Sequence, residues 1–127
     1  MICVDSSALM AIILNEPAAQ PCRDALKAHE MVMISAATLT EAMIAATRRS
    51  VGDQMAALID AAELRTIDVT RESALAAARA YRRWGKSWHA AALNYGDCFS
   101  YELAQRMGCP LLFIGDDFSK TDIQSAL

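Results

Sequence analysis

The stretch "MICVDSSALMAIIL", residues 1–14, joins a short apolar run directly to the start of a helix. The run "MICV" is typical of a buried strand. Asp5 follows it, and the small polar residues after Asp5 favour a helix N-terminus at this point. A strand that runs straight into a helix is the first half of a β–α–β unit, so this stretch predicts an alternating α/β fold.

The alternation of strand and helix patterns continues along the chain. Further strands are expected at residues 31–35, 65–69 and 109–114. Helices are expected at about 6–14, 18–28, 38–50, 53–64 and 71–84, and from 95 to a stop at Gly108. Parallel strands need crossovers of this length, so we expect a parallel sheet of four to five strands with helices on both faces. The length of 127 residues suits a single domain, 1–127.

Composition sets bounds on location and partners. Apolar residues make up 54% of the chain, but the longest apolar run, Ala8–Leu14, is far shorter than the roughly 20 residues that cross a bilayer. The start of the chain also lacks the basic flank of a signal peptide, so a cytoplasmic protein without a membrane segment is expected. A net charge of −3 gives no general basic field, so nucleic acid would have to bind a local patch.

Cysteine and histidine usage disfavours a soft-metal site. The four cysteines are scattered among apolar neighbours without a CxxC pair, and the two histidines have no partner at ligand spacing. We therefore expect buried free thiols.

Acidic residues follow two of the expected strands. Asp5 follows the first strand, and Asp116 and Asp117 follow the last one after a single glycine. The carboxyl ends of parallel strands meet at the sheet edge where ligands bind. Simpler roles are open for these acids, because Asp5 suits a helix cap and the other two suit a turn.

Two further acids, Glu41 and Asp97, lie near helix starts. Thr38 has capping-box spacing to Glu41, as Asn94 has to Asp97, and either acid would gain from the helix dipole.

The helical wheel argues for more than capping. At about 100° per residue, Asp97 falls between Tyr101 and Ala104 on the apolar arc, and Glu41 shares a face with Ile44. Inward carboxylates are costly unless they are paired, protonated or metal-bound. Several at one sheet edge favour Mg²⁺ or Mn²⁺, whose bound water can attack a phosphodiester. The helix that carries Asp97 also has a polar side, which is expected to hold Glu102, Gln105 and Arg106.

Four segments together resemble one protein family. "MICVDSSALMAIILNEP", "SAATLTEAMI", "LNYGDCFSYELA" and "GCPLLFIGDDF", in this order and spacing, resemble the PIN-domain ribonuclease toxins of bacterial VapBC toxin–antitoxin modules. The resemblance runs from Met1 to about Asp122. It implies a Rossmann-like α/β/α sandwich with an acidic pocket that binds Mg²⁺ or Mn²⁺ and cleaves RNA, with structured RNA such as transfer RNA as the target class.

The motifs of the family assign the acids residue by residue. Asp5, Glu41 and Asp97 match its three main acids, and the G-x-D-F loop puts Asp117 in the fourth place. Asp5 and Asp97 are then expected as direct metal ligands, with Glu41 and Asp117 as further ligands or holders of metal-bound water. Asp116 and Asp122 are the alternatives for the fourth acid. The resemblance also implies a homodimer and a cognate VapB antitoxin that inserts an arginine among the acids.

The segment "RAYRRWGKSWH", residues 79–89, alternates basic and aromatic side chains. Cations can contact phosphates and aromatic rings can stack on unpaired bases. An equally good interpretation is a solvated helix end with tryptophans anchored in the core. Candidate RNA contacts are Arg82, Arg83, Trp84, Lys86 and Trp88.

Two other functional classes are alternatives. A phosphatase of the haloacid dehalogenase type needs a second aspartate at the position of Ser7, so that class is disfavoured. A catalytically silent binding module with the same fold, acting through an antitoxin, is the other alternative. The presence of Asp5, Glu41 and Asp97 favours the nuclease.

Overall fold

A four-stranded parallel sheet lies at the centre of the computed structural model, which describes all residues, 1–127. Its strands have the spatial order β3-β2-β1-β4 and are short: β1 (Ile2–Val4), β2 (Val32–Ser35), β3 (Arg65–Ile67) and β4 (Leu111–Leu112). The helices are α1 (Ser6–Ile13), α2 (Ala19–Ala28), α3 (Ala36–Arg48), α4 (Gly52–Ala61), α5 (Arg71–Trp84), α6 (Tyr95–Met107) and the 3-10 turn η1 (Phe118–Lys120).

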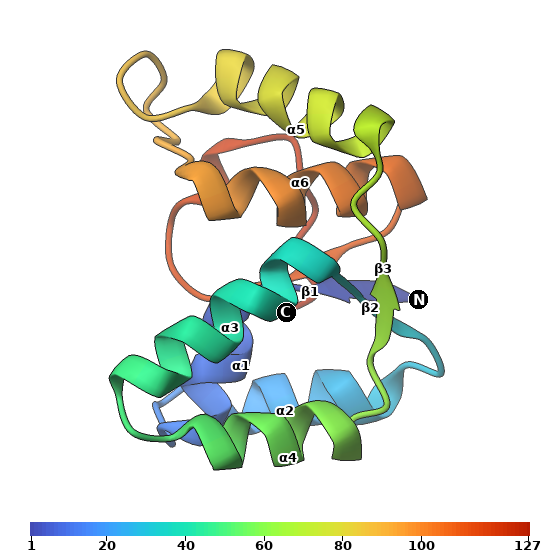
Figure 1. The fold of residues 1–127 in the computed structure, drawn as a ribbon, viewed down its shortest axis with the longest axis vertical. Helices are drawn as coiled ribbons and strands as arrows, with labels where there is room; N and C mark the ends of the chain where they lie inside the picture. The colour runs from blue at the N-terminus through green and yellow to red at the C-terminus, as the bar shows by residue number, and fades with distance from the viewer.

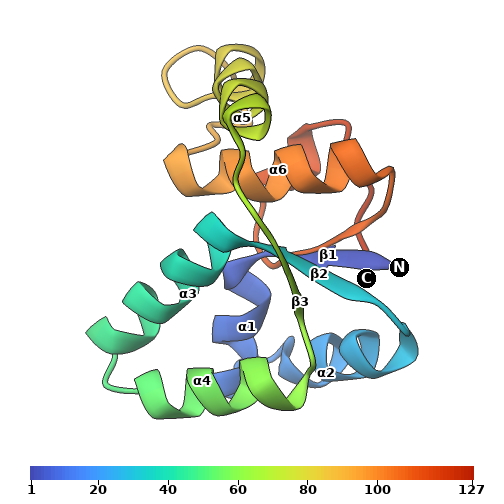
Figure 2. The same ribbon diagram turned by 45° about the vertical axis from the view of Figure 1, so that its right-hand side comes forward.

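The helices cover both faces of the sheet. Figures 1 and 2 show α5 and α6 on one side and α1, α2 and α4 on the other. Side chains alternate along each strand to match: Cys3 and Met33, paired in register, join the core under α5 and α6, whereas Val4 and Ile34 join the core under α1 to α4. The predicted α/β class, the parallel sheet and the two helical layers are confirmed.

The start of α3 differs from the prediction. The helix begins at Ala36, and the Ser35 side chain accepts a hydrogen bond from the Ala37 amide at 3.3 Å. The alternative of a capping box between Thr38 and Glu41 is therefore excluded, because both residues lie inside the helix. Their side chains are free to take partners elsewhere in the fold.

The fourth strand is shorter than predicted. It holds two residues rather than six, because the chain turns away after Leu112 and packs Phe113 against Phe118. On its outer side, the Leu111 amide donates to the Gln124 carbonyl and the Leu111 carbonyl accepts from the Ala126 amide, both at 2.9 Å. This short pairing with residues 124–126 closes that edge of the sheet.

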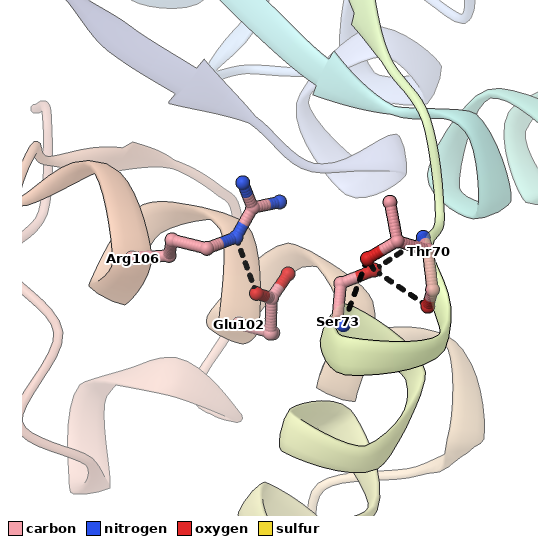
Figure 3. A network of polar contacts seen from close by, with 4 residues as sticks. All are labelled: Thr70, Ser73, Glu102 and Arg106. Carbon is pink, nitrogen blue, oxygen red and sulfur yellow. Dashed lines mark hydrogen bonds and ion pairs between the residues drawn. The ribbon is translucent and has the colours of Figure 1, made fainter.

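Helix α6 is buried on nearly all sides between the sheet and α5. It ends at Gly108, which has a left-handed φ of 62°, as predicted from the sequence. The prediction of a polar side was wrong for Glu102, which is only 7% exposed. Figure 3 shows Glu102, with Arg106 donating to it at 2.6 Å, beside the first turn of α5. The sequence of α6 alone does not show that α5 covers this side.

All four cysteines are buried and free, as predicted, and the sulfur atoms of Cys3 and Cys109 lie 3.3 Å apart. None of the helices has the length and apolarity that crossing a bilayer requires.

The burial of α6 predicts a marked effect of core truncation. Leu103 is 1% exposed, so Leu103→Ala should lower the free energy of unfolding by about 2–5 kcal/mol through lost burial and a cavity. The matched control is Leu75→Ala on α5, where the side chain is 46% exposed and the expected loss is below about 1 kcal/mol. Urea denaturation followed by circular dichroism measures both, and equal losses would contradict the packing described for α6.

Candidate active site

Asp5 lies at the carboxyl end of β1 and caps α1. Its Oδ2 atom accepts from the Ser7 amide at 3.1 Å and from the Ser7 hydroxyl at 2.7 Å. Its Oδ1 atom accepts from the Ser100 hydroxyl on α6 at 2.6 Å. Asp5 is 3% exposed, so these donors take the place of the water molecules that the carboxylate lost on burial. Both oxygens of Asp5 are thus held in place.

The hydroxyl groups around Asp5 connect the surrounding elements. The Ser7 hydroxyl accepts from the Ile114 amide at 3.1 Å, which attaches the segment after β4 to the site. The Ser100 hydroxyl lies 3.1 Å from the hydroxyl of Thr38 on α3. Elements distant in sequence therefore meet at one carboxylate.

Glu41 lies on α3 and approaches the start of α6. Its Oε1 atom accepts from the Ser6 hydroxyl at 2.8 Å. Its Oε2 atom lies against Gly96 so closely that a Cβ atom on that residue would overlap it. Burial raises the pKa of Glu41, the Ser6 hydrogen bond works against this, and the charge of Asp5 raises it further. The side-chain-free surface of Gly96 is what admits the Glu41 carboxylate.

Asp97 occupies the first turn of α6 and forms a full capping box with Asn94. The Asn94 side chain accepts from the Asp97 amide at 2.9 Å, and the Asp97 Oδ2 atom accepts from the Asn94 amide at 3.0 Å. Burial raises the pKa of Asp97 to about 7, the Asn94 hydrogen bond opposes the rise, and the charges of Asp5, Asp117 and Glu41 add to it. Asp97 is therefore both part of a helix cap and close to other acids.

The three candidates for a fourth acid differ in their surroundings. Asp117 is exposed at the start of η1, and its charge contributes to the raised pKa of Asp97. Asp116 is exposed, and its carbonyl accepts from Ser119. Asp122 accepts from the Tyr101 hydroxyl at 2.6 Å and pairs with Arg83 at 3.7 Å. These surroundings favour Asp117.

No basic side chain neutralises the acidic cluster of Asp5, Glu41, Asp97 and Asp117. The chain has two ion pairs, and they involve Asp122 and Glu102. The carboxylates of the cluster are not gathered closely enough for three of them to hold one metal ion as they stand. Hydroxyl and amide donors occupy several of their oxygen atoms instead.

Some of the basic and aromatic residues before α6 pack against other side chains, and others lie on the surface. Trp84 donates to the Tyr101 hydroxyl at 3.0 Å, and the guanidinium of Arg83 lies 4.5 Å from the centroid of the Trp84 ring. The Trp84 ring therefore already has partners. Trp88 is 61% exposed, and its indole N–H donates to the Tyr81 carbonyl at 2.9 Å. Arg82 and Lys86 are exposed.

Three residues of the site could not be assigned to it from the sequence. Ser100, Thr38 and Gly96 hold Asp5 or admit Glu41, yet none is acidic. Ser100 lies one turn after Asp97 on α6, so the helical period could have indicated it. The other two depend on the approach of α3 to α6, which no local pattern shows.

Comparison with known proteins identifies the family of the chain. A sequence model of the PIN domain matches residues 2–124. The ribonuclease VapC30 of Mycobacterium tuberculosis is 40% identical over 123 residues, covering 94% of this chain and 94% of that protein.

Solved structures share the fold at low sequence identity. The crystal structure of Mycobacterium tuberculosis VapC20, described as a sarcin–ricin loop cleaving toxin, superposes with a TM-score of 0.79 at 19% identity, covering 97% of this chain and 96% of that one. A toxin–antitoxin complex from Klebsiella pneumoniae gives a TM-score of 0.74 at 15% identity, covering 100% and 98%. With a family match over nearly its whole length and a relative at this level of identity, the chain belongs to the PIN domain family, among the VapC ribonucleases.

Proposed function

We propose that this chain is a toxin that hydrolyses phosphodiester bonds of RNA with a divalent metal ion, Mg²⁺ or Mn²⁺, held at its acidic cluster. The observation that carries the proposal is the approach of Asp5 and Glu41 to the start of α6, which carries Asp97, without a basic partner. Repulsion among these carboxylates is the condition that a bound cation relieves. The VapC relatives support RNA as the substrate.

The donor set suits a hard divalent ion. All four acids offer carboxylate oxygens, which Mg²⁺ and Mn²⁺ prefer, and no thiol or imidazole is among them. Asp5 and Asp97 are the proposed direct ligands, and Asp117 a further one. These side chains would have to rotate to bring their oxygens together, since they do not yet surround one point. When bound, such an ion activates a water molecule and offsets the charge that develops on the phosphate.

The side chains of the site then have distinct tasks. Ser7 and Ser100 fix the two oxygens of Asp5, which keeps a ligand in place without neutralising it. Glu41 has one oxygen engaged by Ser6 and a raised pKa, so its Oε2 atom is suited to orient the attacking water and accept its proton. No covalent bond to the protein is needed.

The proposed substrate class is structured RNA, such as transfer RNA. A VapC structure of the same fold carries the description of a sarcin–ricin loop cleaving toxin, which supports a structured target. We also propose a homodimer and a VapB-type antitoxin, in line with the toxin–antitoxin complex among the similar structures. An antitoxin arginine among the acids would supply the missing positive charge.

RNA cleavage with purified protein tests the proposal. The wild type should cleave total cellular RNA in the presence of Mg²⁺ or Mn²⁺ and lose this activity in EDTA. Asp5→Asn and Asp97→Asn should each lower the rate at least about 100-fold, because each removes a charge from the cation site.

The control for this assay is Asp60→Asn, which alters an exposed acid on α4. It should cleave at the wild-type rate. Wild-type cleavage that persists in EDTA, or full activity of Asp5→Asn, would refute the metal-dependent mechanism.

The raised pKa of Asp97 predicts a pH-dependent stability. Its pKa is 3.8 ordinarily and about 7 in the folded protein, so the folded state binds the extra proton between these values. The free energy of unfolding should therefore fall as pH rises from about 4 to about 7 in EDTA. Urea denaturation across this range should show a smaller fall with Mg²⁺ present and a smaller fall for Asp97→Asn. Asp60→Asn should keep the wild-type slope, and a wild-type slope in Asp97→Asn would show that Asp97 does not titrate in this range.

The contact between Gly96 and Glu41 predicts a loss of activity without a loss of fold. Gly96→Ala must push the Glu41 carboxylate aside, so RNA cleavage should fall at least about ten-fold while circular dichroism stays unchanged. In a Glu41→Gln background the same substitution should have little further effect, because the two changes act on one group. Additive losses in the double variant would mean that Gly96 acts independently of Glu41.

A further inference from the structure

An apolar cavity of about 510 Å³ lies between α5 and α6, next to the acidic cluster but separate from it. This volume is in the range of small-ligand sites. Its walls are mostly alanine and aromatic side chains: Ala74, Ala77, Ala78 and Tyr81 from α5, Tyr95, Cys98 and Phe99 from α6, with Lys86 and Asn94 between them. None of the catalytic roles assigned above uses this cavity.

The cavity and the acidic cluster share the start of α6. Asn94 lines the cavity and also caps Asp97 through two hydrogen bonds. At about 100° per residue, Tyr95 and Cys98 turn toward the cavity, while Gly96 and Asp97 turn toward the acids. A ligand in the cavity is therefore separated from the acids by only the first turn of one helix.

The aromatic walls are suited to a flat ring. Tyr95 is 79% exposed and meets Phe99 edge to face at 5.1 Å, a geometry in which the two ring faces do not stack on each other. Tyr81 forms a fixed wall, because its hydroxyl donates to the Lys86 carbonyl at 2.9 Å and its ring meets Trp88 at 5.5 Å. Aromatic side chains of this kind stack on unpaired bases of RNA.

Positive charge lies next to these apolar walls. Lys86 is exposed in the cavity wall, and Arg82 lies one turn after Ala78 on α5. RNA offers the flat aromatic face of a base and a phosphate within one nucleotide, which matches an aromatic cavity with a cation in its wall.

We propose that this cavity is a nucleobase subsite, in which one unpaired base of the RNA stacks on Tyr95 and Tyr81. Lys86 contacts a phosphate of the same nucleotide. The base anchors the strand across the start of α6 and directs a neighbouring phosphodiester to the acidic cluster. The inference rests on the proposed ribonuclease function and adds to it a site for base recognition.

Mononucleotides test the subsite without RNA cleavage. Adenosine 5′-monophosphate and uridine 5′-monophosphate are titrated into the wild-type protein in EDTA, and backbone amide shifts are followed by NMR. At least one nucleotide should shift the signals of residues 74–81 and 94–99. Ribose 5-phosphate, which has the same phosphate and sugar but no base, should not shift them.

Substitutions in the cavity walls then test which side chains bind the nucleotide. Tyr95→Ala should weaken nucleotide binding at least about five-fold through lost stacking, whereas Tyr95→Phe should bind within about two-fold of the wild type. Ala78→Trp should fill the cavity and abolish the shifts. Its matched control is Ala57→Trp, at an exposed position of α4, which should leave them unchanged.

The outcomes separate this inference from the proposed function. Nucleotide shifts at the cavity without any RNA cleavage would refute the ribonuclease proposal and keep the subsite. RNA cleavage with no base-dependent shifts, or with equal shifts from ribose 5-phosphate, would refute the subsite alone. An Ala78→Trp variant that binds nucleotides normally but changes its mass in analytical ultracentrifugation would also refute it, because the cavity would then be a protein–protein contact.

Discussion

The crowding of carboxylates at the start of α6, without a basic side chain beside them, is the constraint on which the rest of the site depends. A buried acid without a partner costs free energy, and several together cost more because they repel one another. The fold meets this cost with neutral donors: two serine hydroxyls for Asp5, one for Glu41 and a helix cap for Asp97. Such donors orient the carboxylates but leave their negative charge in place.

The choice of neutral donors has a chemical consequence. An arginine or lysine in the same place would stabilise the charged acids and would also compete with a cation for their oxygens. Hydroxyl groups can rotate, accept as well as donate, and yield when an ion enters. Thr38, Ser100 and Asp5 thus form a polar group that connects α3, α6 and β1. The burial that stabilises α6 is therefore coupled to the arrangement of the site.

Much of this molecule could be predicted from local patterns. The period of apolar residues and the positions of Asp5 and Gly108 were enough for the parallel sheet, the two helical layers and the end of α6. Placing Asp97 inward on the helical wheel was also correct, since it is 7% exposed. For Glu41 the same argument was weaker, because its neighbour Ile44 is 52% exposed.

Several failures came from contacts between distant segments, whereas the start of α3 was missed because of a local cap. Glu102 is buried because α5 lies over a side of α6 that carries polar residues. The α3 start moved to Ala36 because Ser35, at the end of β2, supplies the cap, which left Thr38 to contact Ser100. The role of Gly96 follows only from the packing of α3 on α6, which places the Glu41 carboxylate against it. A helical period shows which side is apolar, not what covers it.

The pairing of residues 124–126 with β4 bears on self-association through the sheet. An open strand edge presents unpaired amides and carbonyls to other molecules and is a common start of aggregation. Here that backbone segment occupies the β4 edge, and the opposite edge is β3, only three residues long with the charged, exposed Arg65 at its start. Neither edge offers a long apolar strand as a template. Association of copies by extension of the sheet is therefore disfavoured.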